Sequence, residues 1–268
     1  MSPNRKLLLC PPDHYGIEYE INPWMKREHK ADTRLVGEQW AGLYGTLREL
    51  GCEVQLLEAQ PKLPDLVFTA NAGLLVGKKF IPSHFRHPER QGEEPHFIQW
   101  FADQGCEIVQ LPDGMFSEGE GDALFFGDAL FCGYKFRSDI RSHQFIADKL
   151  ACLVISVELM DDRFYHLDTC FCPLSADSAM WFPAAFDQYG QRAIRNHIPK
   201  LIEVEPDEAV HFACNAVVLG RDIVLPQGCP KLYAELAAQG FQTHALPMTE
   251  FIKAGGACKC LTLFLPQR

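Results

Sequence analysis

The sequence predicts an α/β fold in which five similar units surround a common axis, forming a five-bladed, pseudo-symmetric α/β propeller. A faint motif of strand, polar connector and second strand returns five times at a period of roughly 50 residues, which is typical of radial or solenoid repetition. Helical patterns alternate with these strands. No linker or low-complexity stretch divides the chain, so we expect a single domain over residues 1–268.

Each repeat opens with a short apolar strand. These strands begin at Cys52, Cys106, Cys152, Leu201 and Phe241. The following strands of several units form hairpins, as in residues 123–134, where Gly127 and Asp128 supply the turn. The predicted unit therefore has two or three short strands and one helix.

Four helices are predicted from apolar spacing and end signals, and each runs directly into the first strand of a repeat. They cover residues 37–50, 93–104, 141–151 and 230–239. In the first, Trp40, Leu43 and Leu47 share one face and Gly51 is a natural stop. The segment from Pro11 to Thr33 fits no repeat, and we expect it to be a loop that covers the site.

A polar residue stands at the head of the second strand in every repeat. The heads are Asn71, Asp122, His166 with Asp168, Asn215 and Cys260. If the units pack around an axis, these equivalent positions converge. Amide, carboxylate, imidazole and thiol groups at one centre are the inventory of a nucleophilic active site rather than of a scaffold.

The bulk composition excludes several classes of function. A formal charge of −10 gives no electrostatic footprint for nucleic acid or for an anionic membrane surface, and it is compatible with a cationic small substrate. The apolar stretch Leu7–Cys10 is too short for a secretory signal, and no run is long enough to span a bilayer, so we expect a cytoplasmic protein. Eleven scattered cysteines argue against a disulfide framework.

Cys260 is the candidate nucleophile, with Cys258 as the fallback. A cysteine beside apolar residues is most often a small buried hydrophobe. Three features favour chemistry here: Gly255 and Gly256 permit close backbone approach, Lys259 would favour a thiolate, and the residue occupies the repeat-equivalent position.

His166 and Asp168 are expected on the same face of an alternating strand, where imidazole and carboxylate suit acid–base work and cation binding. The run Glu118–Asp122 has the composition of an acidic turn. Its two glycines and its place before an apolar hairpin favour a substrate-binding loop.

The pairs Cys170/Cys172 and Cys258/Cys260 also suggest a zinc-stabilised binding module, because four thiols can make a tetrahedral site. The spacing disfavours zinc, since structural sites usually have two to four intervening residues and these pairs have one. We expect no metal and no cofactor.

The segments 64–71 (PDLVFTAN), 118–122 (EGEGD), 166–169 (HLDT) and 255–263 (GGACKCLTL) resemble, in the same order, motifs of the guanidine-modifying superfamily. That superfamily includes arginine deiminases, dimethylarginine dimethylaminohydrolases and amidinotransferases. The resemblance covers nearly the whole chain. It implies a five-bladed propeller of the pentein type, a cysteine nucleophile, a histidine acid–base, and no metal.

Departures within the motifs distinguish the subfamilies. Dimethylargininases carry motifs similar to PDxVFxED and HLK. This chain has Asn71 at the final acid of the first motif and Asp168 at the lysine of the second. Arginine deiminases share HLDT but have an acid where Asn71 stands. The asparagine, together with 21–25 (INPWM) and 251–260, is closely similar to arginine dihydrolases, the N-terminal modules of two-domain bacterial enzymes, in which arginine yields ornithine, ammonia and carbon dioxide.

The resemblance also implies roles for individual residues. Cys260 would attack the guanidinium carbon, and His166 would act as the acid and base. The implied substrate-binding residues are Asn22, Asp65, Asn71, Arg90, Glu118, Asp122, Arg137 and Asp168. The resemblance leaves open a dimethylargininase, an arginine deiminase that gives citrulline, and an amidinotransferase that hands the amidino group to an amine. We expect a small guanidino substrate, no nucleic acid or membrane partner, and a possible homo-oligomer.

Overall fold

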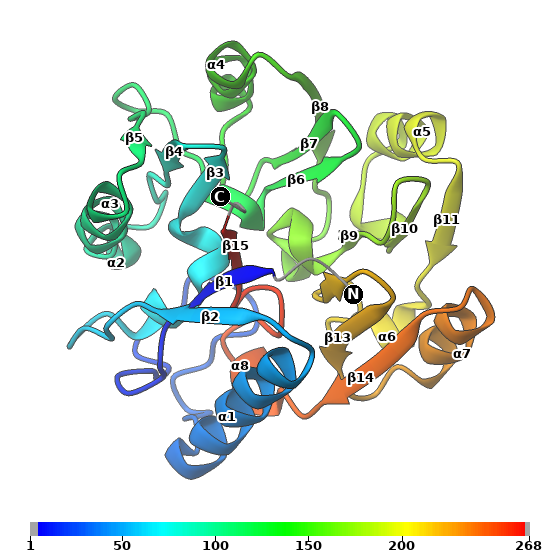
Figure 1. Ribbon diagram of the computed structural model, residues 1–268, viewed down its shortest axis with the longest axis horizontal. Helices are drawn as coiled ribbons and strands as arrows, with labels where there is room; N and C mark the ends of the chain where they lie inside the picture. Colours follow the sequence, from blue (N-terminus) through cyan, green and yellow to red (C-terminus); the bar gives the residue numbers. More distant parts are fainter. Residues whose placement is uncertain (1–4, 266–268) are drawn as a thin grey trace.

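The computed structural model describes residues 5–265, and its strands form five three-stranded sheets arranged in a ring (Figure 1). All five sheets share one connectivity. The first strand pairs antiparallel with the central strand, and the central strand pairs parallel with the third after a helical crossover. The predicted five-unit α/β architecture is confirmed.

Four sheets are built from consecutive strands. They are β3 (Gly73–Val76), β4 (Lys79–Pro82) and β5 (Glu107–Ile108); β6 (Ala123–Phe126), β7 (Ala129–Tyr134) and β8 (Leu153–Glu158); β9 (Phe171–Pro173), β10 (Ser178–Trp181) and β11 (Lys200–Glu203); β12 (Val217–Leu219), β13 (Asp222–Pro226) and β14 (Gln242–Leu246).

The first and last described strands close the ring by building the fifth sheet together with β2. Strand β1 (Lys6–Leu9) lies between β15 (Leu263–Leu265), with which it is antiparallel, and β2 (Glu53–Leu56), with which it is parallel. Leu8 faces Leu263 in this register, and both are fully buried. The blade that follows Cys260 therefore depends on pairing between the first and last described strands (Figure 1).

The crossover helices lie on the outside of the ring (Figure 1). They are α1 (Thr33–Glu49), α3 (Glu94–Asp103), α4 (Ile140–Leu150), α5 (Gln188–His197) and α7 (Pro230–Ala238), with short helices α2 (Pro88–Gln91), α6 (Pro206–Ala209) and α8 (Thr249–Ile252) between elements. All four predicted helices are confirmed. The first begins earlier than expected because the Asp32 carboxylate accepts the N–H groups of Arg34 and Leu35.

Helix α5 was not predicted, because its sequence is mostly polar and only Gly190 and Ile194 are buried, which leaves few apolar residues to mark its buried face. The repeat found in the sequence also straddles two blades. It begins with the third strand of one sheet and ends at the first strand of the next, so β2 and β3, for example, belong to different sheets.

Short 3-10 turns precede β3, β6 and β9 and lie at or next to the polar heads of these strands. They are η1 (Pro64–Val67), η2 (Thr69–Ala72), η3 (Gly119–Gly121) and η5 (Leu167–Thr169), with η4 (Asp162–Phe164) and η6 (Pro183–Ala185) elsewhere. The strand expected over His166 and Asp168 was wrong. His166 is the residue before η5 and Asp168 lies inside this turn, so tight coiling rather than strand alternation places the two side chains.

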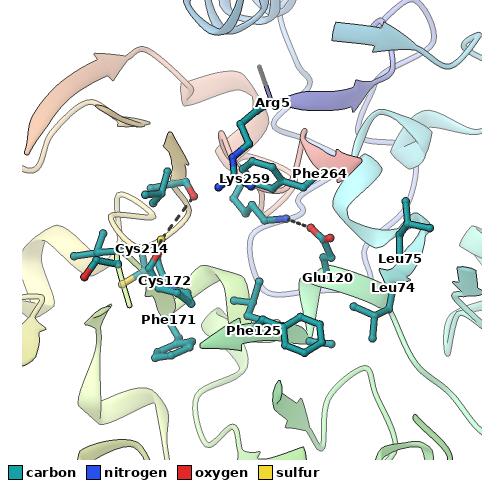
Figure 2. A pocket seen from close by; sticks show the side chains of 17 residues that line it. Arg5, Leu74, Leu75, Glu120, Phe125, Phe171, Cys172, Cys214, Lys259 and Phe264 are labelled. Atoms are coloured by element: carbon teal, nitrogen blue, oxygen red, sulfur yellow. Dashed lines mark hydrogen bonds and ion pairs between the residues drawn. The ribbon is translucent and has the colours of Figure 1, made fainter. Parts of the chain in front are cut away.

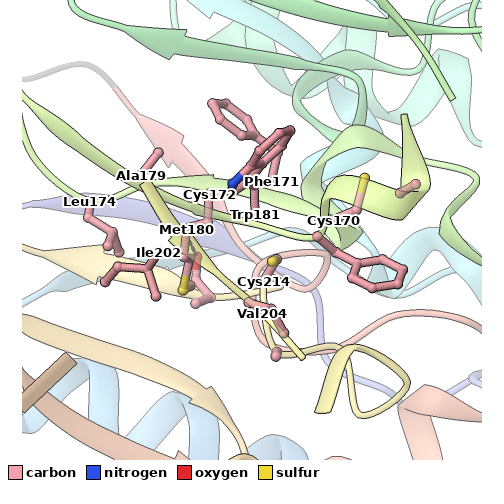
Figure 3. Packing of buried hydrophobic residues seen from close by; sticks show 14 of the residues in the cluster. Cys170, Phe171, Cys172, Leu174, Ala179, Met180, Trp181, Ile202, Val204 and Cys214 are labelled. Atoms are coloured by element: carbon pink, nitrogen blue, oxygen red, sulfur yellow. Dashed lines mark hydrogen bonds between the residues drawn. The ribbon is translucent and has the colours of Figure 1, made fainter. Parts of the chain in front are cut away.

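Apolar side chains fill the spaces within and between blades. Figure 3 shows part of the largest cluster, where Cys170 and Cys172 pack with Trp181, Met180 and Cys214. These thiols behave as small hydrophobes, and burial raises the pKa of Cys172 to about 12. Within residues 5–265, no group of three or more His, Cys, Asp or Glu side chains is arranged to hold a metal ion.

Candidate active site

The polar heads of the five repeats meet where the first strands of the blades begin. Each is almost completely buried, with an exposed fraction of 2 % or less: Asn71, Asp122, His166, Asp168, Asn215 and Cys260. Hydrogen bonds between different blades join them, so the predicted convergence is confirmed. Each of the five blades supplies at least one of these heads, and the centre therefore depends on the whole ring.

Cys260 lies in the turn before β15, with its sulfur between an amide and a carboxylate. Its Sγ is 3.0 Å from Nδ2 of Asn215 and 3.4 Å from Oδ2 of Asp168. Burial, followed by the negative charge of Asp168, raises the pKa of the Cys260 thiol well above its ordinary value. A cationic ligand beside the sulfur would oppose both effects, because it stabilises the thiolate.

Asp168 is also perturbed by its surroundings. Burial raises the pKa of its carboxyl group to about 7, and the ammonium of Lys259 offsets part of that rise. Near neutral pH the carboxyl is therefore close to its midpoint. A bound cation would shift it to the ionised form, in which both oxygens accept hydrogen bonds.

His166 is held by Glu118, which is itself held by Arg137. Oε2 of Glu118 lies 2.7 Å from Nε2 of His166 and 3.1 Å from Nη1 of Arg137. Burial alone would raise the pKa of Glu118, but Arg137 and the His166 hydrogen bond outweigh it and hold that pKa below its usual range. Because the ionised carboxylate can only accept, the proton of His166 is on Nε2, which leaves Nδ1 to exchange protons with a ligand.

Arg90 forms a second buried cluster with Glu93 and Asn71. Its Nε and Nη2 donate to the two oxygens of Glu93 (2.8 and 2.7 Å), Nη2 also donates to the carbonyl of Asp65 (3.2 Å), and Nη1 donates to Oδ1 of Asn71 (2.9 Å). Four of the five guanidinium N–H groups are used, which leaves one on Nη1 for a ligand among the contacts of the described chain.

These bonds also orient Asn71. Since Oδ1 accepts from Arg90, the amide nitrogen faces the other way and donates to the carbonyl of Glu118 (3.4 Å). One N–H of Nδ2 remains. A Cβ on Gly121 would collide with this nitrogen, so the glycine of the EGEGD run is required for the approach of the loop to Asn71.

Asp65 carries an unsatisfied carboxylate oxygen. The residue is 2 % exposed, its Oδ2 is 3.9 Å from Nε of Arg90, and its Oδ1 has no hydrogen-bond partner among the described residues. Burial raises the pKa of Asp65, and the charge of Arg90 and the nearby Tyr19 hydroxyl, which lies outside ordinary hydrogen-bond geometry, oppose that rise. A buried acceptor without a donor is costly, which suits it to a ligand that brings its own N–H groups.

The segment before α1 lies against the same centre, in agreement with the expected cover. Oδ1 of Asn22 accepts the N–H groups of Trp24 and Met25, and its Nδ2 donates to the carbonyl of Ala254 (3.0 Å). Arg137 donates to the carbonyl of Ile21 (3.1 Å). This segment is therefore tied both to the Glu118 cluster and to the turn that leads to Cys260.

Asp122 differs from the other expected ligands. Its Oδ1 accepts the N–H of Leu167 (3.1 Å) and its Oδ2 accepts the hydroxyl of Ser138 (2.6 Å), whose oxygen accepts the N–H of Glu118. Both oxygens are occupied by protein donors. This geometry favours a positioning role, in which Asp122 fixes the turn after His166, over the substrate contact that we expected.

Lys259 forms no hydrogen bond with the thiol among the described contacts, so it acts on Cys260 through its charge alone. Its Nζ binds Glu120 (2.9 Å) and the carbonyl of Thr262 (3.2 Å). Figure 2 shows this ion pair at a cavity of about 440 Å³, which Arg5 and Phe264 also line. Consecutive residues thus face different spaces, with Lys259 in this cavity and Cys260 in the buried centre.

Sequence reasoning did not assign site roles to Asn215, Glu93 or Ser138. Asn215 was recognised only as a repeat head, although that position was itself the signal. Glu93 lies three residues after Arg90 on a helical stretch, a spacing that predicts an ion pair. Nothing in the sequence marks Ser138.

Charge is unbalanced at the centre. Five carboxyl groups are buried there, in Asp65, Glu93, Glu118, Asp122 and Asp168. The buried cationic groups beside them are the guanidinium groups of Arg90 and Arg137 and, near Asp168, the ammonium of Lys259, which is paired with Glu120. Because burying an unpaired anion is unfavourable, the excess of carboxyls favours a cationic ligand.

The comparison with known proteins agrees with this chemistry. The family model for eukaryotic N,N dimethylarginine dimethylhydrolase matches residues 17–265. The chain belongs to this family. A dimethylarginine dimethylaminohydrolase of Mycobacterium tuberculosis is 37% identical over 259 residues, which cover 97% of this chain and 85% of that protein.

Two longer relatives are more similar in sequence. The bifunctional arginine dihydrolase/ornithine cyclodeaminases ArgZ of Synechocystis sp. and AgrE of Nostoc sp. are 48% and 46% identical over 268 residues. The chain spans 38% of the length of each.

Solved structures have the same fold. The N-terminal domain of ArgZ bound to product superposes with a TM-score of 0.95 at 46% identity, covering 99% of this chain and 98% of that one. A dimethylarginine dimethylaminohydrolase adduct with S-methyl-L-thiocitrulline matches at a TM-score of 0.82 and 18% identity, a likeness of fold alone. Within the described residues, no helix is long and apolar enough to cross a membrane.

Proposed function

We propose that this protein hydrolyses the guanidino group of arginine through a covalent intermediate on Cys260, and that it removes both terminal nitrogens as an arginine dihydrolase. The observation that carries the proposal is the buried Cys260 sulfur 3.4 Å from the Asp168 carboxylate, in a centre with excess carboxyl groups. A guanidinium group fits such a place because it is planar, cationic and rich in N–H donors.

The guanidinium binds first. Resonance spreads its charge, so the carbon is a poor electrophile until it is held against the nucleophile. Asp168 accepts two of its N–H groups and fixes its plane beside Sγ of Cys260. The cation lowers the pKa of the neighbouring thiol, and the thiol proton passes to His166.

Two chemical steps follow. The thiolate forms a C–S bond to the guanidinium carbon, His166 gives its proton to one nitrogen, the C–N bond breaks and ammonia leaves. Water then gives a proton to His166 while its oxygen bonds to the carbon of the thiouronium. The C–S bond breaks and its electron pair returns to sulfur.

The amino acid end has its own set of groups. Oδ1 of Asp65, which has no donor in ordinary hydrogen-bond geometry among the described residues, accepts from the α-ammonium. The free N–H groups of Arg90 and Arg137 bind the α-carboxylate, and Asn22 closes the site over it. Because Glu118 and Glu93 hold the two arginines, recognition of the amino acid is coupled to the orientation of His166.

Asn71 bears on the number of nitrogens removed. Its remaining N–H is a neutral donor, suited to the carbonyl oxygen of a ureido group, whereas a carboxylate there would repel that oxygen. Retaining citrulline allows Cys260 to attack a second time, so that the second ammonia leaves; water then displaces the sulfur to give the carbamate of ornithine, which breaks down to ornithine and carbon dioxide. In ArgZ, a variant with serine in place of one asparagine is covalently bound to a reaction intermediate, and the N-terminal domain has also been solved bound to product.

Incubation with arginine, followed by product identification by mass, tests the proposal. We expect ornithine with two ammonia per arginine and little free citrulline. Citrulline with a single ammonia would make the protein a deiminase. New guanidino compounds on adding glycine or ornithine would make it an amidinotransferase.

Dimethylargininase activity is the second candidate, because the matching family model and the Mycobacterium tuberculosis relative carry that name. Asn71 and Asp168 depart from the dimethylargininase motifs. Turnover of asymmetric dimethylarginine without turnover of arginine would support this candidate and overturn the dihydrolase.

A further inference from the structure

Asn215 precedes β12, at the position equivalent to Asn71, Asp122, His166 and Cys260 in the other blades. It is 0 % exposed. The mechanism above gives a task to a residue from every blade except the β12–β14 blade. Its head is nevertheless the group closest to the attacking sulfur, at 3.0 Å.

The orientation of the Asn215 amide is fixed by its oxygen. Oδ1 accepts three backbone N–H groups from the turn that contains the nucleophile, those of Ala257 (3.1 Å), Lys259 (3.0 Å) and Cys260 (3.1 Å). A flipped amide would point its own N–H groups at these three donors. The nitrogen must therefore face Sγ.

Both N–H groups of this nitrogen have acceptors. One acceptor is Sγ of Cys260, and the other is the carbonyl of Asp168 at 3.2 Å. The amide thus joins the nucleophile to the residue that holds the guanidinium. In a buried setting a hydrogen bond to a charged sulfur is stronger than in water, and no water competes for it.

We propose that Asn215 is a catalytic residue whose Nδ2–H donates to the Cys260 sulfur and stabilises its thiolate, both for attack on the guanidinium carbon and when the C–S bond breaks. This inference rests on the proposed function for its catalytic consequence. The hydrogen bond itself is independent of the substrate.

The hydrogen bond from Asn215 stabilises the thiolate, whereas the other surroundings of the sulfur destabilise it. Asp168 contacts the same sulfur from a carboxylate, and burial also disfavours the charged form, so the thiolate needs a favourable partner when no cation is bound. Asn215 is such a partner and adds no charge. It therefore leaves the preference of the centre for cations unchanged.

Asn215→Asp is the most direct variant, because it keeps Oδ1 for the three N–H groups of the turn and replaces only the donor by an oxygen. The exposed Asn196→Asp in α5 is the matched control. The rate of Cys260 alkylation by iodoacetamide, followed by peptide mass against pH without substrate, measures the thiolate. We expect the rate at neutral pH to fall about 10- to 100-fold and its midpoint to move to higher pH in Asn215→Asp alone.

Catalysis gives the second readout. In Asn215→Asp, kcat with arginine should fall by a similar factor, while arginine binding, measured in a Cys260→Ser background, changes less than threefold. An alkylation profile identical to wild type in the folded variant would overturn the proposal. If wild type does not hydrolyse arginine but alkylation still shifts, the proposed function fails and the thiolate bond stands.

Asn215→Ala offers a second variant without the donor. Should neither variant fold, the unmutated chain provides the test. The NMR chemical shift of the Asn215 side-chain amide must then change with pH around the midpoint that alkylation gives for Cys260. A chemical shift that does not change with pH would refute the hydrogen bond.

Discussion

Replacing Asn71 by Asp should convert loss of two nitrogens into loss of one. The change keeps Oδ1, which accepts from Nη1 of Arg90 at 2.9 Å, so the side chain stays in place. It replaces Nδ2 by an oxygen, which removes the remaining donor and places two oxygens against each other at the carbonyl of Glu118. The variant therefore alters one interaction with the bound intermediate product rather than the shape of the site.

The magnitude follows from that one interaction. Losing a buried hydrogen bond and leaving an acceptor unsatisfied costs about 2 kcal/mol, which corresponds to roughly 30-fold weaker retention of the ureido group. Citrulline should then leave before a second attack, and the ammonia released per arginine should fall from near two towards one.

The assay is ammonia and citrulline measured together during turnover of arginine. Asn196→Asp, the same change on the exposed face of α5, should behave as wild type. If Asn71→Asp still releases two ammonia per arginine at an unchanged rate, the role given to the neutral amide is wrong.

Further predictions concern the nucleophile, the acid–base and the charges. Cys260→Ser should abolish turnover without unfolding the protein. Cys258 lies in an apolar cluster, so Cys258→Ser should keep measurable activity. Intact-mass and steady-state assays would show the opposite pattern if Cys258 were the nucleophile. His166→Ala should abolish product release, because His166 moves protons both when ammonia leaves and when water attacks, and full activity would remove its acid–base role. Glu118→Gln should lower the free energy of unfolding by about 3 kcal/mol, because it leaves the buried Arg137 without its anionic partner. The same change at the exposed Glu89 should have little effect, and denaturant titration measures both variants. Burial raises the pKa of Asp168 to about 7, and the guanidinium requires the ionised form of this carboxyl. Arginine binding to Cys260→Ser should therefore tighten from pH 6 to pH 8 and release protons at pH 6. Calorimetry in buffers of different ionisation enthalpy measures this release, and its absence would contradict the prediction.

The repeat and its polar heads could be predicted because every blade uses the same local signals. A helix stop, a short apolar strand and a polar residue before the next apolar run recur with similar spacing. The boundary between blades could not be predicted. In the sequence β2 and β3 follow one another like strands of one unit, and nothing marks that β2 pairs with β1 across α1 and so belongs to a different sheet from β3.

The contacts of individual side chains were predicted less well than the positions of the residues. Lys259 was expected to favour the thiolate of its neighbour Cys260, yet the turn before β15 directs the ammonium of Lys259 to Glu120 and the sulfur of Cys260 to Asn215. Likewise, Asp122 fills its oxygens with Ser138 and Leu167. Motifs place residues near a centre, but only tertiary contacts decide which polar atoms remain for a ligand.

The most direct test of the central claim is intact-mass measurement of wild-type protein quenched during turnover of arginine. We predict a transient adduct equal in mass to arginine less one ammonia, located on the peptide that carries Cys260, which disappears as ornithine forms. Turnover of arginine with no adduct under any quench time, or an adduct on another cysteine, would contradict the account.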